Sequence, residues 1–126
     1  MKYEKDIYDW TLKLGVKVVF EYKKLRKNRV DFAIANQFLR SGTSIGANVT
    51  EGKASSSRKE LIRYYEIALR SAHETEYWIR LIQSAYSENN IAIEEELKKE
   101  INEIIKVISS IVLKLKKTIV QKDDRH

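Results

Sequence analysis

The chain has 126 residues, 43% hydrophobic and 33% charged, which is typical of one folded domain spanning residues 1–126 and not of a disordered chain. It has no proline, no cysteine and only four glycines, which disfavours many short strands and excludes disulfides, thiolate metal sites and thiol catalysis. The net charge of +6 is uneven: residues 1–63 hold 14 Lys and Arg against 7 Asp and Glu, whereas residues 64–126 hold 10 against 11.

The first predicted element is an amphipathic helix over residues 4–27, whose apolar stripe is Ile7, Trp10, Leu14, Val18 and Leu25. Its end carries the run KKLRKNR, with five cations: Lys23, Lys24, Arg26, Lys27 and Arg29. Such a cluster attracts nucleic acid or an acidic partner. Lysines at a helix C-terminus also complement the helix dipole and are often only solvated. Both interpretations stay open at this point.

The second predicted helix, residues 31–51, has Asp31 as its N-cap and Gly52 at its C-terminus. It contains RSGTSIGANVTEG, whose glycines, serines and threonines are typical of a loop. Apolar and small residues nevertheless continue at alternating steps of three and four through it: Ala35, Phe38, Gly42, Ile45 and Val49. Glycine in a helix costs roughly 1 kcal/mol against alanine, so we expect Gly42 and Gly46 to admit a neighbouring helix.

A line of polar residues accompanies this seam: Gln37, Ser41, Ser44, Asn48 and Glu51. Partners are expected on the third helix, where another polar line lies: Arg63, Arg70, Glu74 and Tyr77. One interpretation is a hydrogen-bonded network that fixes the register of the two helices. The other is a polar pocket or a subunit contact.

The third predicted helix, residues 57–87, begins with Ser57 and Glu60 in a capping box. The fourth, residues 91–121, has Asn90 as its predicted cap and glutamates in its first turns. The fourth helix carries a core stripe and also a second apolar row, Ile105, Val112 and Ile119. That row indicates either a wide core face or a surface for self-association.

Four helices with short connections predict an all-α, up-down-up-down four-helix bundle. No stretch is apolar enough to span a membrane and the first residues lack a signal-peptide core, so we expect a cytoplasmic protein.

The sequence offers little catalytic or metal chemistry. The glycines lack the Lys-Ser/Thr pair of a phosphate loop, and His73 alone cannot complete a di-iron site. Ser71, His73 and Glu74 are too close along one helix to converge. We therefore expect no cofactor, no metal and no enzyme activity.

Two segments, residues 37–52 and residues 57–82, resemble the four-helix-bundle family of 23S rRNA intervening sequence proteins. The matching residues are Gln37, Arg40, Ser44, Ile45, Ala47, Asn48, Glu51, Gly52, Ser57, Ile67, Ala68, Ala72, Glu74, Tyr77 and Trp78. The resemblance implies a homopentamer of four-helix bundles around a central channel. It also implies kinship with basic accessory proteins of diversity-generating retroelements, which bind a reverse transcriptase and nucleic acid.

The resulting hypothesis is a non-enzymatic homopentamer that contacts RNA or DNA phosphates. Its candidate contacts are Lys23, Lys24, Arg26, Lys27, Arg29, Arg40, Arg58 and Lys59. The alternative is a scaffold for a reverse-transcriptase-like partner. The network residues are expected to be Gln37, Ser44, Asn48, Glu51, Arg70, Glu74 and Tyr77, and the subunit contacts Ile105, Val112 and Ile119.

Overall fold

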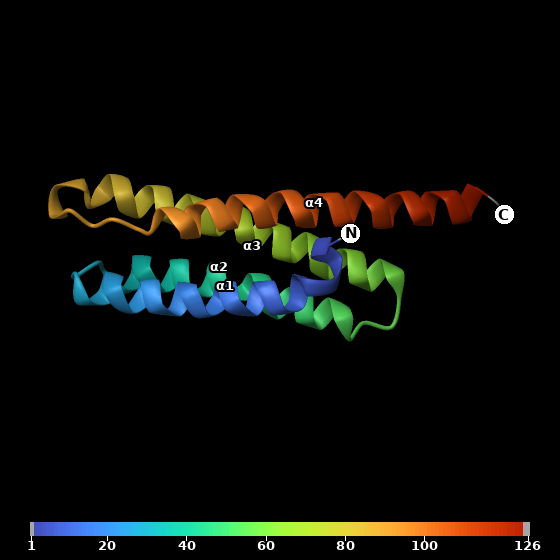
Figure 1. The fold of residues 1–126 in the computed structure, drawn as a ribbon, viewed down its shortest axis with the longest axis horizontal. Helices are drawn as coiled ribbons and strands as arrows, with labels where there is room; N and C mark the ends of the chain where they lie inside the picture. The colour runs from blue at the N-terminus through green and yellow to red at the C-terminus, as the bar shows by residue number, and fades with distance from the viewer. Residues whose placement is uncertain (1, 125–126) are drawn as a thin grey trace.

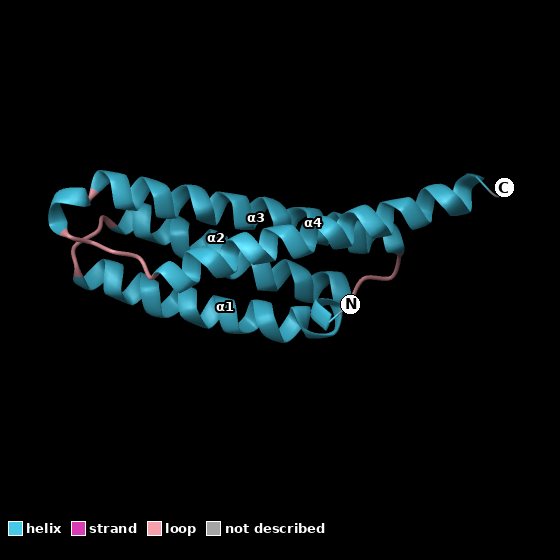
Figure 2. Cartoon of the chain, turned by 45° about the horizontal axis from the view of Figure 1, so that its top comes forward, coloured by secondary structure: helices cyan, strands magenta, loops and turns pink. Residues whose placement is uncertain are grey.

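The computed structural model describes the backbone of residues 2–124 and the side chains of residues 7–119. Over that part of the chain it has four α-helices, α1 (Lys2–Lys27), α2 (Phe32–Lys53), α3 (Arg58–Ala85) and α4 (Glu95–Asp124), with a short 3-10 helix η1 (Ser87–Asn89). Successive helices run in opposite directions side by side, which confirms the predicted all-α four-helix bundle (Figure 1). The C-terminal end of α4 projects beyond the other helices (Figure 2).

The core is made of the predicted apolar stripes. Every seam residue of α2 is buried, and Phe38, Ile45 and Val49 are fully inaccessible to solvent. The stripes of the other helices meet them, with Leu14 and Val18 from α1 and a run of isoleucines from α4. The loop-like composition of residues 40–52 therefore belongs to a central helix.

α1 lies so close to α2 that two glycines are required. A Cβ on Gly42 would lie 2.6 Å from a methyl carbon of Val18, and a Cβ on Gly46 would lie 3.0 Å from the Thr11 carbonyl oxygen. The expected close approach at these glycines is confirmed, and α1 is the approaching helix.

The turn between α1 and α2 is a Schellman motif with arginine at the position that usually holds glycine. Arg29 has a φ of 66°. The amide of Val30 donates to the Leu25 carbonyl over 3.0 Å, and the amide of Arg29 donates to the Arg26 carbonyl over 3.1 Å. Val30 and Leu25 are both buried, which adds the apolar contact of that motif.

The helix ends differ in detail from the predicted ones. Ser57 caps α3 by accepting a hydrogen bond from the Glu60 amide over 3.1 Å, as expected. Asp31 precedes α2 but its side chain makes no cap bond; it accepts a hydrogen bond from the Tyr86 hydroxyl over 3.2 Å. Gly52 lies in the last turn of α2 without a positive φ, and a Cβ there would lie 3.3 Å from Leu61.

The predicted start of the fourth helix was wrong. Asn90 is left-handed, with a φ of 54°, and ends η1 instead of capping α4, which starts at Glu95. The intervening segment, residues 91–94, is not helical, and it buries Ile91 and Ile93. Side chains two apart share one side of an extended segment, so both isoleucines reach the core before the helix begins.

Candidate nucleic-acid interface

Five cations gather where α1 ends, and we call Lys23, Lys24, Arg26, Lys27 and Arg29 the α1 cluster. All five are exposed. They come from one helical turn and the Schellman motif that follows it, so the backbone beneath them is fixed by hydrogen bonds. Cations in this position also face the negative end of the α1 dipole.

The α1 cluster is only partly neutralised. The ammonium of Lys24 lies 3.4 Å from an oxygen of Glu21, a carboxylate that is only 3% exposed. The other Glu21 oxygen is buried without a hydrogen-bond partner among the described residues. Within the same part of the chain, no carboxylate forms an ion pair with Lys23, Lys27 or Arg29. These cations are therefore available to an external anion.

Two exposed phenylalanines border the α1 cluster. The ammonium of Lys23 lies 5.8 Å from the centre of the Phe20 ring. The guanidinium of Arg26 lies 5.5 Å from the centre of the Phe32 ring and donates a hydrogen bond to the Val30 carbonyl over 2.8 Å. Both distances are within the range of cation–π attraction. Neither ring was among the predicted site residues, although both stand close to the basic run in the sequence.

The remaining predicted cations lie elsewhere. Arg40 is exposed on α2 and borders a groove between α2 and α3 that also includes Gln37, Ser44 and Glu74. Arg58 and Lys59 lie in the first turn of α3, and the α2–α3 turn is at the opposite end of the bundle from the α1–α2 turn (Figure 1). The eight predicted contacts thus fall in three places, of which the α1 cluster is the densest.

The polar line beside the α2 seam meets hydroxyl groups of α3. The Ser71 hydroxyl donates to Ser44 over 3.0 Å, and the Asn48 amide donates to Ser44 over 2.8 Å. The Thr75 hydroxyl lies 3.0 Å from that of Ser41, in the buried interior. These bonds tie α2 to α3 at two levels, so short hydroxyl side chains provide the α2–α3 polar contacts.

Long members of the predicted network point outward instead. Gln37, Glu51, Arg70, Glu74 and Tyr77 are exposed. Glu74 accepts a hydrogen bond from the Trp78 indole over 2.9 Å, on its own helix. Charged side chains next to a core keep their hydration by turning away from it, which leaves the buried bonds to serine and threonine.

Two of the three residues predicted as subunit contacts pack against the core of their own chain. Val112 is only 6% exposed and belongs to the core, and Ile105 is half-buried against it. Ile119 is half-buried near the end of α4. The wide-core interpretation therefore accounts for Val112 and Ile105 in the single chain.

Another apolar surface is left open on α1. Leu12 is 65% exposed and Val16 is 47% exposed. They border a groove of about 530 Å³ between α1 and α2, whose lining also includes Gly46 and Ala47. The signal in the sequence was an apolar pair four residues apart on the lysine-bearing side of α1.

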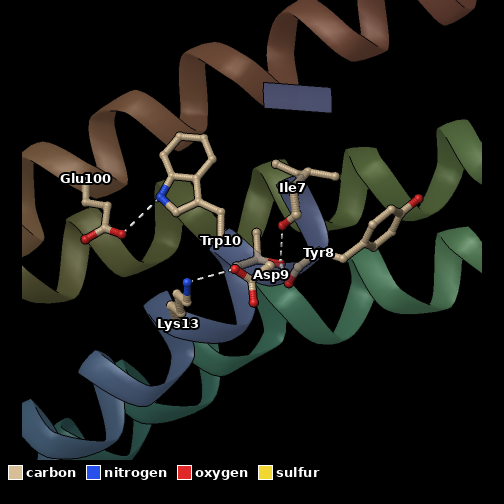
Figure 3. A network of polar contacts seen from close by, with 7 residues as sticks. Ile7, Tyr8, Asp9, Trp10, Lys13 and Glu100 are labelled. Atoms are coloured by element: carbon tan, nitrogen blue, oxygen red, sulfur yellow. Dashed lines mark hydrogen bonds and ion pairs between the residues drawn. The ribbon is translucent and has the colours of Figure 1, made fainter. Parts of the chain in front are cut away.

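α1 and α4 are joined through side chains across a second groove. The indole of Trp10 donates to one oxygen of Glu100 over 3.0 Å, and the ammonium of Lys17 donates to the other over 2.7 Å. Figure 3 shows the indole pointing across to α4, with Lys13 paired to Asp9 on α1 itself. The hydrogen bond to Glu100 raises the pKa of Lys17 above its ordinary value, and the glutamates at the start of α4 add to it. The two bonds to Glu100 therefore join α1 to α4 across this groove.

The described residues contain neither a group of potential metal ligands nor a membrane-spanning helix. Among them, no three His, Cys, Asp or Glu side chains lie where they would hold a metal ion. In the same range, no helix combines the length and apolarity that crossing a bilayer requires.

Comparison with known proteins places this bundle in a family. The sequence model of the family of 23S rRNA-intervening sequence proteins matches residues 4–110. The chain belongs to this family. A crystal structure of a protein with unknown function, of the S23 ribosomal protein family from Bacteroides thetaiotaomicron VPI-5482, is 38% identical and has a TM-score of 0.77. The match covers 84% of the present chain and 97% of that one. No curated protein sequence matched significantly.

Family membership confirms the resemblance based on residues 37–52 and 57–82. In this chain, Gly42 and Gly46 allow α1 to lie close to α2, and the hydrogen bond between Ser71 and Ser44 joins α2 to α3.

Proposed function

We propose that this family member is a non-enzymatic homopentamer that binds nucleic acid by its phosphates, through the α1 cluster. The observation that carries the proposal is the density of unneutralised charge: five cations within residues 23–29, four of them without a carboxylate partner among the described residues. Positive groups that release counterions from phosphates provide affinity that does not depend on sequence.

Assembly would make this modest charge effective. One chain has a net charge of +6, so five copies present a field that a single copy lacks. A strand that touches several α1 clusters at once gains avidity without any new contact. The supporting observation for self-association is the open apolar groove beside Leu12 and Val16.

The experiment is a salt titration of binding to generic RNA and DNA, followed by fluorescence anisotropy. The logarithm of affinity should fall linearly with the logarithm of salt concentration, by about 0.7 to 0.9 for each phosphate contacted. Replacing Lys23 and Lys27 with glutamine should weaken binding and flatten that slope. The matched control removes the same charge from α4, where Lys106 and Lys117 are also exposed; it should leave the slope nearly unchanged.

Absence of binding at low salt would refute the nucleic-acid proposal. If the same two substitutions instead abolished capture of one acidic protein, the α1 cluster would belong to a protein contact, as expected for the scaffold alternative. Light scattering tests assembly separately: a monomer mass would refute the pentamer and leave the binding result standing.

A further inference from the structure

The chain contains three phenylalanines, and two of them are placed on the surface beside the α1 cluster. Phe38 is fully buried in the core, whereas Phe20 is 60% exposed and Phe32 is 57% exposed. Exposing a phenylalanine forgoes roughly 1.5–3 kcal/mol of burial. Two such rings beside the densest group of cations are complementary to a ligand that has both an aromatic surface and negative charge.

Each ring already carries a cation, at 5.8 Å for Lys23 over Phe20 and at 5.5 Å for Arg26 over Phe32. A cation beside a ring provides the two contacts that a nucleotide needs, a flat surface for its base and a positive group for its phosphate. Arg26 is held by the Val30 carbonyl, so its guanidinium plane is itself a fixed stacking surface.

Phe20 lies one helical turn beyond Val16 on the same face of α1, past the end of the apolar groove used in the assembly proposal. The groove is bordered by Leu12 and Val16 and does not include Phe20. Phe32 is the first residue of α2, at the end of the bundle. The two rings therefore flank the α1 cluster, one on each side of the turn.

We propose that Phe20 and Phe32, each with its adjoining cation, form a stacking platform that selects unpaired nucleic acid over duplex. This inference rests on the proposed function, because it names the ligand class of the same α1 cluster. Bases of a duplex are stacked on one another and offer no free face, whereas bases of a single strand stack on aromatic side chains. From Phe20 to the end of α1 is about 10 Å at the helical rise, so a strand of a few nucleotides spans the distance from the Phe20 ring to the last cations of α1.

The test compares single-stranded and duplex oligonucleotides of one sequence with the full chain. The double variant Phe20→Leu/Phe32→Leu keeps apolar bulk and charge but removes both aromatic faces. Stacking on each ring is expected to contribute about fivefold in affinity, at the low end for base–aromatic stacking, so the double variant should bind a single strand about 25-fold more weakly. Duplex affinity should change less than about twofold. The salt slope for the single strand should not change, because no cation is removed.

Tyr77→Leu is the matched control. Tyr77 is an aromatic residue that is 56% exposed, its ring packs edge-on against Trp78 at 5.0 Å, and it lies on α3, a different helix from those of Phe20 and Phe32. It should leave both affinities unchanged. Circular dichroism and light scattering of each variant check that the fold and the subunit number are retained.

Equal losses for single strand and duplex, or no loss at all, would overturn the platform. If the wild type still bound with a steep salt dependence, the phosphate-binding function would stand without it. A changed subunit number in the phenylalanine variant would assign the rings to a protein contact and also overturn the platform. Failure of the wild type to bind either oligonucleotide would refute the proposed function, and the platform with it.

Discussion

Replacing Gly42 with alanine tests whether the close packing of α1 against α2 contributes to the stability of the bundle. The new Cβ would lie 2.6 and 2.8 Å from the two methyl carbons of Val18 and 3.2 Å from its Cβ. Rotating Val18 cannot clear all three contacts, because its own Cβ is among them, so α1 must move. Such overpacking costs typically 1–3 kcal/mol, against a gain of about 1 kcal/mol in helix propensity. We therefore expect a net loss of up to about 2 kcal/mol.

Gly15→Ala is the matched control, since no atom lies within 4 Å of a Cβ placed there. The same chemical change should stabilise α1 by up to about 1 kcal/mol. Urea unfolding followed by helical circular dichroism measures both variants. It should be done at two protein concentrations, since subunit association adds a concentration-dependent contribution. Gly42→Ala at least as stable as Gly15→Ala would refute the steric argument. A second substitution, Val18→Ala, should lower the cost of Gly42→Ala and show a favourable coupling.

Three further outcomes are expected. Arg29→Gly should raise the unfolding free energy by about 0.5–1 kcal/mol, because glycine adopts the left-handed backbone conformation of this position without strain. It should also weaken nucleic-acid binding by removing one cation. A less stable variant would contradict the argument that the positive φ of Arg29 is strained. Ser57→Ala should lower the unfolding free energy by about 1 kcal/mol through loss of the α3 cap, whereas Ser56→Ala, which loses only an exposed hydrogen bond to the Glu60 carboxylate, should have a smaller effect. Since the pKa of Lys17 is raised in the folded chain, its bond to Glu100 should stabilise at neutral pH and be lost as pH rises above the ordinary lysine value; a Lys17→Gln difference that persists in strong alkali would contradict this.

The helices of the core were predictable because their seams are long and regular. The buried side of α2 could be predicted from the sequence alone. Apolar or small residues at steps of three and four mark that side even where glycine and serine dominate the composition. The start of α4 was missed because Asn90 followed by glutamates is typical of a helix start. The spacing of Ile91 and Ile93, two residues apart, indicated a non-helical segment instead. Both isoleucines are buried in the structure, so the segment stays non-helical and α4 begins after it.

The candidate site was predictable only in part. The α1 cluster is contiguous in the sequence, so its position at the end of one helix followed from the run itself. Periodicity shows which side of one helix is apolar but not how far a neighbouring helix covers it. Val112 is therefore buried by the bundle, while Leu12 and Val16, on the lysine side of α1, remain open. The ring–cation pairs depend on side-chain rotamers, which no spacing rule specifies.

The Schellman motif at Arg29 has a consequence for how tightly so few cations can bind. A basic tail that orders on a ligand gives up roughly 1–2 kcal/mol of backbone entropy per residue. Residues 23–29 have already lost that freedom on folding, because the Val30 and Arg29 amides are bonded back to α1. A ligand then orders only side chains, at about 0.5–1.5 kcal/mol each. The turn thus preorganises the α1 cluster for the phosphate binding proposed above, and its affinity per cation should exceed that of a flexible arm of equal charge.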